Sequence, residues 1–406
     1  MISVNEAFNI LSSHSVDFGC ELVPITKATG RILRENIYAD QDMPPFDRVS
    51  MDGIAIRYEA LEKGQRSFTI SAMAAAGTPK ATLMADENCI EIMTGSILPF
   101  DADTIVPYEW ISINGNIATL TKENVIRGQN VHRKGKDRKK NDLLVGAGCI
   151  ISPAEIGVLA SVGKSLINVS RLPKILIIST GNELIDLDEL PLPHQIRKSN
   201  VYQLQSALQA MNIHADTFHL QDDYDVIRNA LKGYVNTYDI LMISGGVSEG
   251  KYDFIPKALE SIGVQQYFYK IKQRPGKPFW FGKHESGCAV FAVPGNPVSS
   301  FLCFIRFINP WIALSLQKKP SAQRIAILSE DVSFKPDLTY FLSVRLYQNE
   351  TGQLIAVPFA GHGSGDLANL ADTDAFIELP AGKDVFTKGE IYSIFEFSQC
   401  RHLSSR

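Results

Sequence analysis

Hydrophobic and polar positions alternate in two different rhythms along the chain. Between about residues 171 and 318, apolar runs of strand length, such as KILIIST and YDILMIS, take turns with stretches whose apolar residues recur at helical spacing, such as SNVYQLQSALQAMN. Apolar strands separated by amphipathic helices predict an α/β domain with a doubly wound, mostly parallel sheet that helices cover on both faces. Ligands of such sheets bind beyond the carboxyl ends of the strands. The pattern therefore also predicts where a site should lie.

The flanking sections follow other patterns. Up to about residue 170, β-prone runs such as FTISAMAAAGTP and NCIEIMTGSILP are separated by Gly, Pro and Asn, which predicts a small, mostly β insertion. Near the N-terminus, Ser3 and Glu6 form a capping-box pattern that opens a helix. After about residue 319, short apolar runs alternate with turn signals, which predicts a small β-barrel.

The strands of the middle section end in chemically unusual loops. Four of them, all expected at one edge of the sheet, contain glycine together with Ser, Asn or charge: STGNEL, SGGVSEGKYDF, RPGKP and PGNPVS. Glycine lets backbone amides face a ligand, and a helix N-terminus adds partial positive charge for a phosphate. One such loop is also what an ordinary turn after a buried strand looks like. Four on one edge favour an anion site, where Asn296 could also cap the next helix.

Acidic residues accompany these glycines, namely Glu183, Asp222, Glu249 and Asp253. A carboxylate 4 Å from a phosphate charge is repelled by about 1 kcal/mol in water and about 4 kcal/mol at an effective dielectric constant of 20. Such a site would oppose its own ligand unless a cation intervened. Mg²⁺, which binds through one or two carboxylates plus substrate oxygens, fits that need. The alternative is that these acids are helix caps and solvated loop charges.

Composition excludes several classes of protein. The 406 residues are 45% hydrophobic and carry a formal net charge of -4, which supports sizeable cores and gives no global sign of nucleic-acid or anionic-membrane binding. The N-terminus shows no signal-peptide pattern, and three prolines and an arginine interrupt the apolar region 288–316, so we expect no membrane span. The six cysteines lie far apart, as is typical of reduced thiols in a cytoplasmic protein. Dinucleotide-binding and Walker glycine motifs are absent.

Seven motifs occur in one order along the chain: PPFDRVSMDGIAI, IMTGSILP, GQNVHRKGKD, STGNEL, SGGVSEGKYDF, RPGKP and PGNPVS. In this order they resemble the molybdopterin molybdenumtransferases, the MoeA family, to which the C-terminal part of gephyrin is similar. The resemblance covers essentially the whole chain. It implies an enzyme of molybdenum cofactor synthesis that takes adenylylated molybdopterin and molybdate, inserts the metal into the dithiolene and releases AMP in a Mg²⁺-dependent step.

The resemblance also implies a subunit of four domains. These are a discontinuous dimerisation domain of residues 1–40 and 142–170, an inserted β-rich domain of residues 41–141, a molybdopterin-binding α/β domain of residues 171–318 and a C-terminal β-barrel of residues 319–406. The α/β domain is similar to the molybdopterin adenylyltransferases. The family forms homodimers whose active cleft lies between the third domain of one subunit and the second domain of its partner. Further implied partners are a molybdopterin adenylyltransferase and molybdoenzyme maturation factors, in the cytoplasm.

Matched motif by motif, the resemblance assigns roles to individual residues. The catalytic ones would be Asp52, Thr94, Asp137 and Glu183. The Mg²⁺ ligands would be Asp222 and Asp253. The cofactor-binding residues would be Gly245, Gly246, Ser248, Arg274, Lys277, Gly295, Asn296, Ser299 and Ser364. Two candidate anion contacts depart from the family, because His132 replaces the first arginine of a usual run and Ser343 stands where an arginine is common, two residues before Arg345.

Two other functions stay open. A molybdopterin adenylyltransferase would use the same α/β pocket on ATP and molybdopterin, but such enzymes resemble only the middle third of the chain. A non-enzymatic, gephyrin-like scaffold would use the dimer to hold receptor peptides, which leaves the acids at the strand ends unexplained. The basic run HRKGKDRKK lacks interleaved aromatic residues, so we expect a loop that collects anions and no nucleic-acid site.

Overall fold

The computed structural model describes residues 1–247, 253–359, 361 and 363–398 of the chain. Its internal contacts define two compact units. Unit 1 comprises Met1–Arg34, Gly148–Ser152 and Leu166–Arg406, and unit 2 comprises Glu35–Ala147 and Pro153–Ser165. Unit 1 contains an α/β sheet and a β-barrel, and unit 2 is rich in β-strands. The finer division into four domains stays a prediction.

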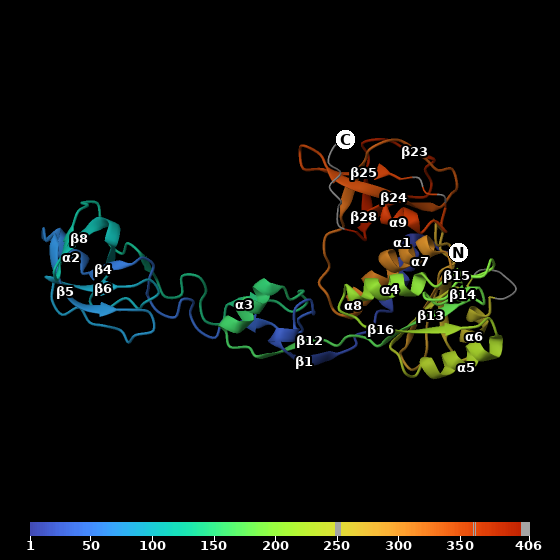
Figure 1. Ribbon diagram of the computed structural model, residues 1–406, viewed down its shortest axis with the longest axis horizontal. Coiled ribbons are helices and arrows are strands. Elements are labelled where there is room, and N and C mark those ends of the chain that lie inside the picture. Colours follow the sequence, from blue (N-terminus) through green and yellow to red (C-terminus); the bar gives the residue numbers. More distant parts are fainter. Residues whose placement is uncertain (248–252, 360, 362, 399–406) are drawn as a thin grey trace. The chain divides into compact units, whose positions relative to one another are not determined.

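The centre of unit 1 is a six-stranded sheet with the strand order β16-β13-β17-β21-β20-β18 (Figure 1). The first four strands are parallel to one another, whereas β20 and β18 run antiparallel to their neighbours. The prediction of a mostly parallel sheet is therefore confirmed. The strands span β13 (Ile175–Thr180), β16 (Ala215–Leu220), β17 (Ile240–Ser244), β18 (Gln265–Tyr269), β20 (Trp280–Lys283) and β21 (Ala289–Val293).

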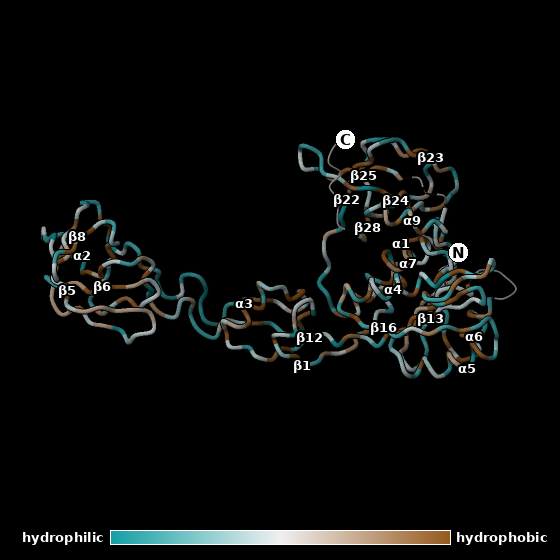
Figure 2. Tube along the Cα trace, viewed as in Figure 1, coloured by the Kyte–Doolittle hydropathy of each residue, from teal (hydrophilic) through white to brown (hydrophobic). Residues whose placement is uncertain are grey.

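Helices cover both faces of this sheet. Along β13, Ile175 and Ile177 face one hydrophobic cluster, whereas Leu176 and Ile178 face a second one. Because side chains alternate along a strand, a strand buried on both faces must be apolar at every position. Figure 2 shows this hydrophobic colouring along β13. The first cluster includes residues of α1 (Val4–Ser13), α4 (Asn200–Gln209), α7 (Pro297–Cys303) and α8 (Asn309–Ser315), and the second includes residues of α5 (Tyr224–Tyr234) and α6 (Ile255–Ser261).

One helical run in the described residues, Pro297–Ser315, is long and apolar enough to cross a membrane by length and composition alone. It consists of α7, a π-helical turn at Phe304–Ile308, and α8. In the protein 78% of it is buried, and residues such as Phe304, Phe307 and Trp311 belong to the larger hydrophobic cluster. The run therefore acts as a core helix of unit 1.

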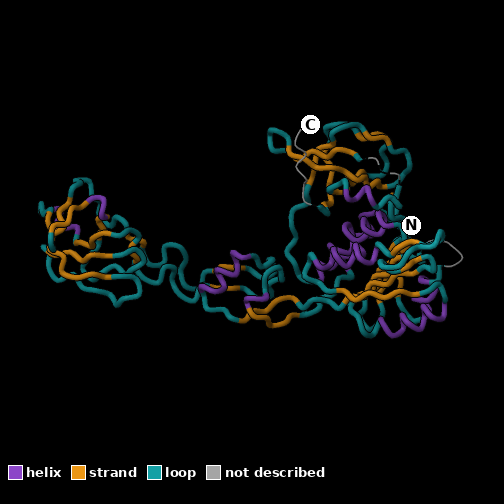
Figure 3. The backbone as a smooth tube through the Cα atoms, viewed as in Figure 1, coloured by secondary structure: helices purple, strands orange, loops and turns teal. Residues whose placement is uncertain are grey.

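The C-terminal part of unit 1 is a closed barrel of five strands in the order β24-β25-β22-β28-β26, with β26 pairing back to β24. This confirms the predicted barrel, and Figure 3 shows the region as mostly strand and loop. A short strand, β19 (Gln273–Arg274), leaves the α/β part and pairs with the start of β24. It ties the RPGKP loop to the barrel. The bounds are β22 (Ile325–Leu328), β24 (Thr339–Gln348), β25 (Leu354–Pro358), α9 (Ala368–Ala371), β26 (Ala375–Leu379) and β28 (Ile391–Glu396).

Unit 2 contains a six-stranded mixed sheet in the order β7-β4-β6-β5-β9-β8, with a hydrophobic cluster on each face. The predicted β-rich insertion is therefore present. Its main elements are β4 (Gly53–Ile56), α2 (Tyr58–Glu62), β5 (Ser67–Ala74), β6 (Asn88–Ile92), β7 (Thr104–Pro107), β8 (Ile111–Asn114) and β9 (Ile117–Leu120). Beside the sheet, β3 (Arg48–Val49) pairs with β10 (Val131–His132).

Short elements complete both units. In unit 1, β1 (Cys20–Pro24) pairs with β12 (Leu166–Ser170), β14 (Leu184–Ile185) with β15 (Ile196–Arg197), and β23 (Val332–Ser333) with β27 (Val385–Phe386). In unit 2, β2 (Ile37–Tyr38) pairs with β11 (Leu143–Val145), and α3 spans Pro153–Ser161. The predicted capping box opens α1, because the Glu6 amide donates to Ser3 Oγ at 3.2 Å and the Ser3 amide donates to Glu6 Oε2 at 2.7 Å.

Candidate active site

A cavity of about 800 Å³ lies at the carboxyl ends of the parallel strands, where the fold class predicts a ligand. Its walls come from the loops after β13, β17 and β21 and from the start of α4. We call it the acidic cavity, because three predicted carboxylates, those of Glu183, Asp222 and Asp253, line it. Two bases, Arg197 and Lys198, line it as well.

The environment of Asp222 raises the pKa of its carboxyl group. Burial raises the pKa of Asp222 above its usual value, and the negative charges of Glu183 and Asp253 act in the same direction. The Asn182 amide, which donates to Asp222 Oδ2 at 3.3 Å, opposes this shift only in part. A carboxyl group has a raised pKa of this kind when it is buried and when other negative charges lie near it. In the described part of the chain no three His, Cys, Asp or Glu side chains form a complete metal cage.

The glycines of the acidic cavity are required by close packing. A Cβ atom on Gly245 would lie 2.7 Å from Thr180 Oγ1, and one on Gly246 would lie 2.7 Å from Ile255 Cγ1. Both glycines have a positive φ, of 101° and 66°, which other residues rarely adopt. Gly295 lies opposite, because a Cβ built on it would be 3.8 Å from Gly245 Cα. Ser248, which the sequence predicts as a cofactor-binding residue of the loop after β17, lies outside the described residues, as does Glu249.

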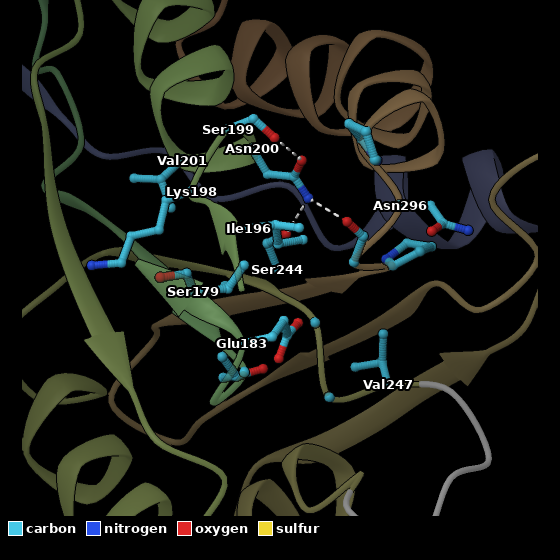
Figure 4. Close-up of a pocket in the computed structure, with 18 of the residues that line it drawn as sticks. Ser179, Glu183, Ile196, Lys198, Ser199, Asn200, Val201, Ser244, Val247 and Asn296 are labelled. Carbon is cyan, nitrogen blue, oxygen red and sulfur yellow. Dashed lines mark hydrogen bonds between the residues drawn. The ribbon is translucent and has the colours of Figure 1, made fainter. Parts of the chain in front are cut away.

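The sequence did not predict several residues that line this cavity, among them Arg197, Lys198, Asn200 and Thr180. Asn200 Nδ2 donates to Ser244 Oγ at 2.8 Å and to the Gly295 carbonyl at 2.7 Å, so it joins the loops after β17 and β21 (Figure 4). Thr180 Oγ1 is buried and has no hydrogen-bond partner among the described residues. For Asn200 and Thr180 the available signals were the Ser-Asn pair at the start of α4 and the threonine inside STGNEL.

A second cavity, of about 660 Å³, lies between the RPGKP loop and the barrel. We call it the basic cavity, because Arg274 and Lys277 are the charged residues among the described residues that line it. Gln273 stabilises the RPGKP loop, because its Nε2 donates a hydrogen bond to the Gly276 carbonyl at 3.1 Å. A Cβ atom on Gly276 would lie 2.7 Å from Gln273 Nε2 and 3.0 Å from Cys303 Sγ, so this position also needs glycine.

The two cavities adjoin, because Pro278, Pro294 and Asn296 line both of them. The expectation that the Asn296 side chain caps α7 is wrong. Asn296 occupies the N-cap position, but its side chain makes no capping bond and its Nδ2 donates to Ser364 Oγ at 2.9 Å. The Val298 amide donates to the Ser364 carbonyl at 3.2 Å, so the barrel loop contacts the helix start. Ser299 is 3% exposed and lines the basic cavity.

One departure from the family pattern lies in the wall of the basic cavity. Ser343 lines this cavity and is buried. Arg345 is held behind it, because its Nε donates to the Asp372 carbonyl at 2.7 Å and its guanidinium carbon lies 4.2 Å from the centre of the Phe359 ring. Phe359 itself lines the cavity. Arg345 itself is not among the described residues that line the cavity.

In unit 2, two predicted residues are in direct contact. The backbone amide and the hydroxyl of Thr94 donate to Asp52 Oδ1 at 2.6 and 2.7 Å, and both bonds lower the pKa of Asp52. This carboxylate is exposed and ionised. Tyr108 follows β7, donates its hydroxyl to Glu91 Oε1 at 2.6 Å, and has a raised pKa because of burial, Glu91 and Asp52. Acidic groups therefore surround the start of β4.

The basic run of unit 2 is paired internally. Asp137 Oδ1 lies 2.8 Å from His132 Nε2, so the histidine that replaces a usual arginine contacts a predicted catalytic acid. Arg133 Nη1 donates to Asp47 Oδ2 at 2.7 Å, and the Lys134 amide donates to Asp47 Oδ1 at 2.8 Å. These contacts fix the run as a loop against the residues that precede β3.

Three family models match the chain in order. They are the MoeA N-terminal region (domain I and II) over residues 2–163, a probable molybdopterin binding domain over residues 176–314, and the MoeA C-terminal region (domain IV) over residues 326–397. With the fold and the paired cavities, they define the class as a protein of the MoeA type. The chain belongs to the molybdopterin molybdenumtransferase family.

Individual relatives cover nearly the whole chain. The molybdopterin molybdenumtransferase of Synechocystis is 36% identical over 398 residues, which span 97% of this chain and 100% of the relative. That of Bacillus subtilis is 29% identical over 97% of this chain and 93% of its own length. The crystal structure of the molybdopterin biosynthesis moeA protein from Pyrococcus horikoshii OT3 matches with a TM-score of 0.82 and 27% identity, over 98% of this chain and 100% of that one.

Proposed function

We propose that this chain is a transferase that inserts molybdenum into molybdopterin during molybdenum cofactor synthesis. The family supports the reaction class. The observation that carries the proposal is the pair of adjoining cavities, one lined by three carboxylates and glycine loops and the other by two bases without a carboxylate among its described lining residues. A substrate that joins a phosphate chain to a second anionic part requires two such neighbouring environments.

The substrate that we propose is adenylylated molybdopterin, with release of AMP. Its phosphates would lie in the acidic cavity against the loop of Gly245 and Gly246, because a glycine loop exposes amide donors. Asp222 and Asp253 would hold Mg²⁺, with Glu183 beside them. The donor set fits this ion, since Mg²⁺ takes one or two carboxylates plus phosphate oxygens and needs no complete protein cage. Bound Mg²⁺ would neutralise charge as the phosphoanhydride breaks.

Arg274 and Lys277 would hold the anionic part of the substrates that enters the basic cavity. An oxyanion such as molybdate can be bound directly there, because the described lining residues of that cavity include no carboxylate. Ser299, Asn296 and Ser364 lie at the junction and would orient the substrate between the two cavities. Preorganised donors of this kind lower the barrier by fixing the reacting groups.

Three further parts of the proposal concern assembly. We propose a homodimer in which Asp52, Thr94 and Asp137 of a second copy complete the acidic cavity. The cytoplasm is the proposed location, in keeping with reduced cysteines. A molybdopterin adenylyltransferase would supply the substrate, and molybdoenzyme maturation factors would receive the product.

The test is a turnover assay with purified protein, adenylylated molybdopterin, Mg²⁺ and molybdate. AMP release that depends on both Mg²⁺ and molybdate supports the proposal. Consumption of ATP with plain molybdopterin would instead identify an adenylyltransferase, and the absence of both activities would leave a scaffold.

A further inference from the structure

A third cavity, of about 300 Å³, lies within unit 1, and none of its described lining residues lines the acidic or the basic cavity. Residues 30–32, Ile150 and Ser170 form part of its wall, and the ends of α4 and α8 form the rest. The first three of these segments lie a few residues from points where the chain passes between units 1 and 2. We therefore call it the linker cavity.

The charged side chains among the described lining residues of the linker cavity are both basic, Arg31 and Lys318. Arg31 Nη2 donates to Glu21 Oε1 at 2.6 Å and to the Ser170 carbonyl at 2.7 Å, so its guanidinium is held in place. Glu21 balances the charge of Arg31 but does not line the cavity. Lys318 forms no ion pair or side-chain hydrogen bond within the part of the chain that the structure describes. Its charge is left unbalanced, which favours an anion with a single negative charge.

Two asparagines add amide groups to this wall. Asn212, which has a φ of 60°, lies so close to Gly30 that a Cβ atom on Gly30 would be 2.2 Å from Asn212 Nδ2. Asn309 begins α8 directly after the π-helical turn Phe304–Ile308, and its side chain makes no hydrogen bond within the described residues. Turns of this kind inside helices are frequently found at functional sites. The amide of Asn309 is thus a hydrogen-bond donor that a carboxylate oxygen could use.

The rest of the wall is apolar and the cavity is small. Five residues supply the apolar surface, namely Ile32, Ile150, Leu172, Met211 and Leu316. Small-molecule sites commonly join such a surface with a few polar groups, and their volumes run from about 300 to 1,000 Å³. The linker cavity lies at the lower end of this range. It therefore suits a ligand of about the size of one substituted ring, whereas a nucleotide is too large.

We propose that the linker cavity binds a small organic monocarboxylate, with the carboxylate group at Lys318, Arg31 and Asn309 and the apolar part against the aliphatic side chains. This inference does not depend on the proposed function. The wall segments that such a ligand contacts are hydrogen-bonded to one another, because Ile32 forms a bridge with Ile150 and the Ser170 amide donates to the Ile32 carbonyl at 2.9 Å. A bound carboxylate should therefore stabilise the segments that lead to unit 2.

The test uses 4-fluorobenzoate, whose single charge and ring match the two parts of the wall and whose binding fluorine NMR measures. We expect Lys318→Met to bind this probe about tenfold more weakly than the wild type, because a charge-assisted contact is lost. Lys319→Met is the matched control, since Lys319 is an exposed neighbour that is not among the described lining residues, and its affinity should stay within about twofold. Arg274→Met should also bind the probe normally, which distinguishes this site from the basic cavity.

Two measurements on the wild type cover the case in which Lys318→Met does not fold. The neutral 4-fluorobenzamide should bind about tenfold more weakly than 4-fluorobenzoate. With 4-fluorobenzoate at about ten times its Kd, amide hydrogen exchange at Ile32, Ile151 and Ser170 should slow by up to about tenfold.

Four results would overturn the proposal. The first is the absence of 4-fluorobenzoate binding up to about 10 mM. The second is equal binding of the neutral amide, and the third is weaker binding in Arg274→Met with normal binding in Lys318→Met. The fourth is 4-fluorophenyl phosphate binding about tenfold more tightly than 4-fluorobenzoate, which would assign the cavity to phosphate esters.

Discussion

The two cavities share a wall and yet differ in the charges that line them. The acidic cavity is lined by the carboxylates of Glu183, Asp222 and Asp253 together with the bases Arg197 and Lys198, whereas the charged residues among the described lining of the basic cavity are Arg274 and Lys277. A phosphate close to carboxylates requires a cation between them, but an anion in a cavity lined by bases without carboxylates does not. The difference shows how one edge of a sheet can bind two anionic parts of a substrate separately, one through a metal and the other directly.

The cavities also differ in how the chain builds them. The acidic cavity consists of loops that directly follow β13, β17 and β21, and its shape depends on positive-φ glycines. The basic cavity also needs the barrel, because residues of β24 such as Tyr340 and Ser343 line it together with the RPGKP loop. The pairing of Gln273 with Thr339 and the contact of Asn296 with Ser364 connect the barrel to the α/β part there.

Loss of a carboxylate from the acidic cavity should have the largest effect. We expect Asp253→Asn to lower turnover by about 100-fold or more, because a metal ligand is removed from the site of charge development. The melting temperature should change little, since Asp253 lies on a loop outside the hydrophobic clusters. Asp225→Asn, an exposed acid on α5, is the control and should keep normal turnover. A parallel loss of stability and activity in Asp253→Asn would contradict its role.

Loss of a base from the other cavity should have a smaller and more selective effect. We expect Arg274→Met to raise the half-saturating molybdate concentration by about tenfold, because a charge-assisted contact is lost. Binding of AMP with Mg²⁺ should stay within about twofold of the wild type. Lys335→Met, a barrel lysine outside both cavities, serves as the control. If Arg274→Met instead weakens AMP and spares molybdate, the division between the cavities is wrong.

The sequence predicted the acidic cavity far better than the basic one. The strand-end loops could be found locally, because apolar strands in a parallel sheet bring their carboxyl ends to one edge. The walls of the basic cavity come from segments far apart in the chain, such as Arg274 and Tyr340, and no local pattern indicates that they meet. Asn200 and Asn296 show a second limit. An asparagine side chain can cap a helix or connect two loops, and only the fold determines which of these it does. Here the Asn200 side chain donates to Ser244 and the Asn296 side chain donates to Ser364.

Two aspartates of the α/β part should respond to pH in opposite directions. Burial acts to raise the pKa of Asp239, but hydrogen bonds from Arg171 at 3.0 Å and from the Lys174 amide at 2.7 Å outweigh it and lower the pKa. Its contribution to stability is present above the unfolded pKa of about 3.9 and is lost as pH falls through the lower folded value. The pKa of Asp222 is raised, so its ionised form opposes folding at neutral pH.

We therefore expect Asp239→Asn to lower the free energy of unfolding by about 1 kcal/mol at pH 7, and the loss should shrink below about pH 4. Asp222→Asn should cost nothing at pH 7 in the absence of Mg²⁺ and ligands. Urea unfolding of both variants at pH 7 and at low pH measures the difference. A destabilised Asp222→Asn protein would show that this carboxylate supports the fold.

The smallest effect concerns Thr180, whose buried hydroxyl has no hydrogen-bond partner in the described part of the chain and lies next to Gly245 and Gly246 of the acidic cavity. Valine has the same shape, so Thr180→Val should stabilise the ligand-free protein by about 0.5 kcal/mol, because an unpaired buried polar group is removed. If the hydroxyl serves the ligand, the same change should weaken binding of AMP with Mg²⁺ by about threefold. Ser300→Ala is the matched control, since Ser300 Oγ is also buried without a hydrogen-bond partner among the residues that the structure describes, but Ser300 does not line either cavity. Both variants should melt at a higher temperature without ligand, and only Thr180→Val should bind AMP more weakly. A ligand-free Thr180→Val protein that melts lower would mean that the hydroxyl stabilises the fold and does not serve the substrate.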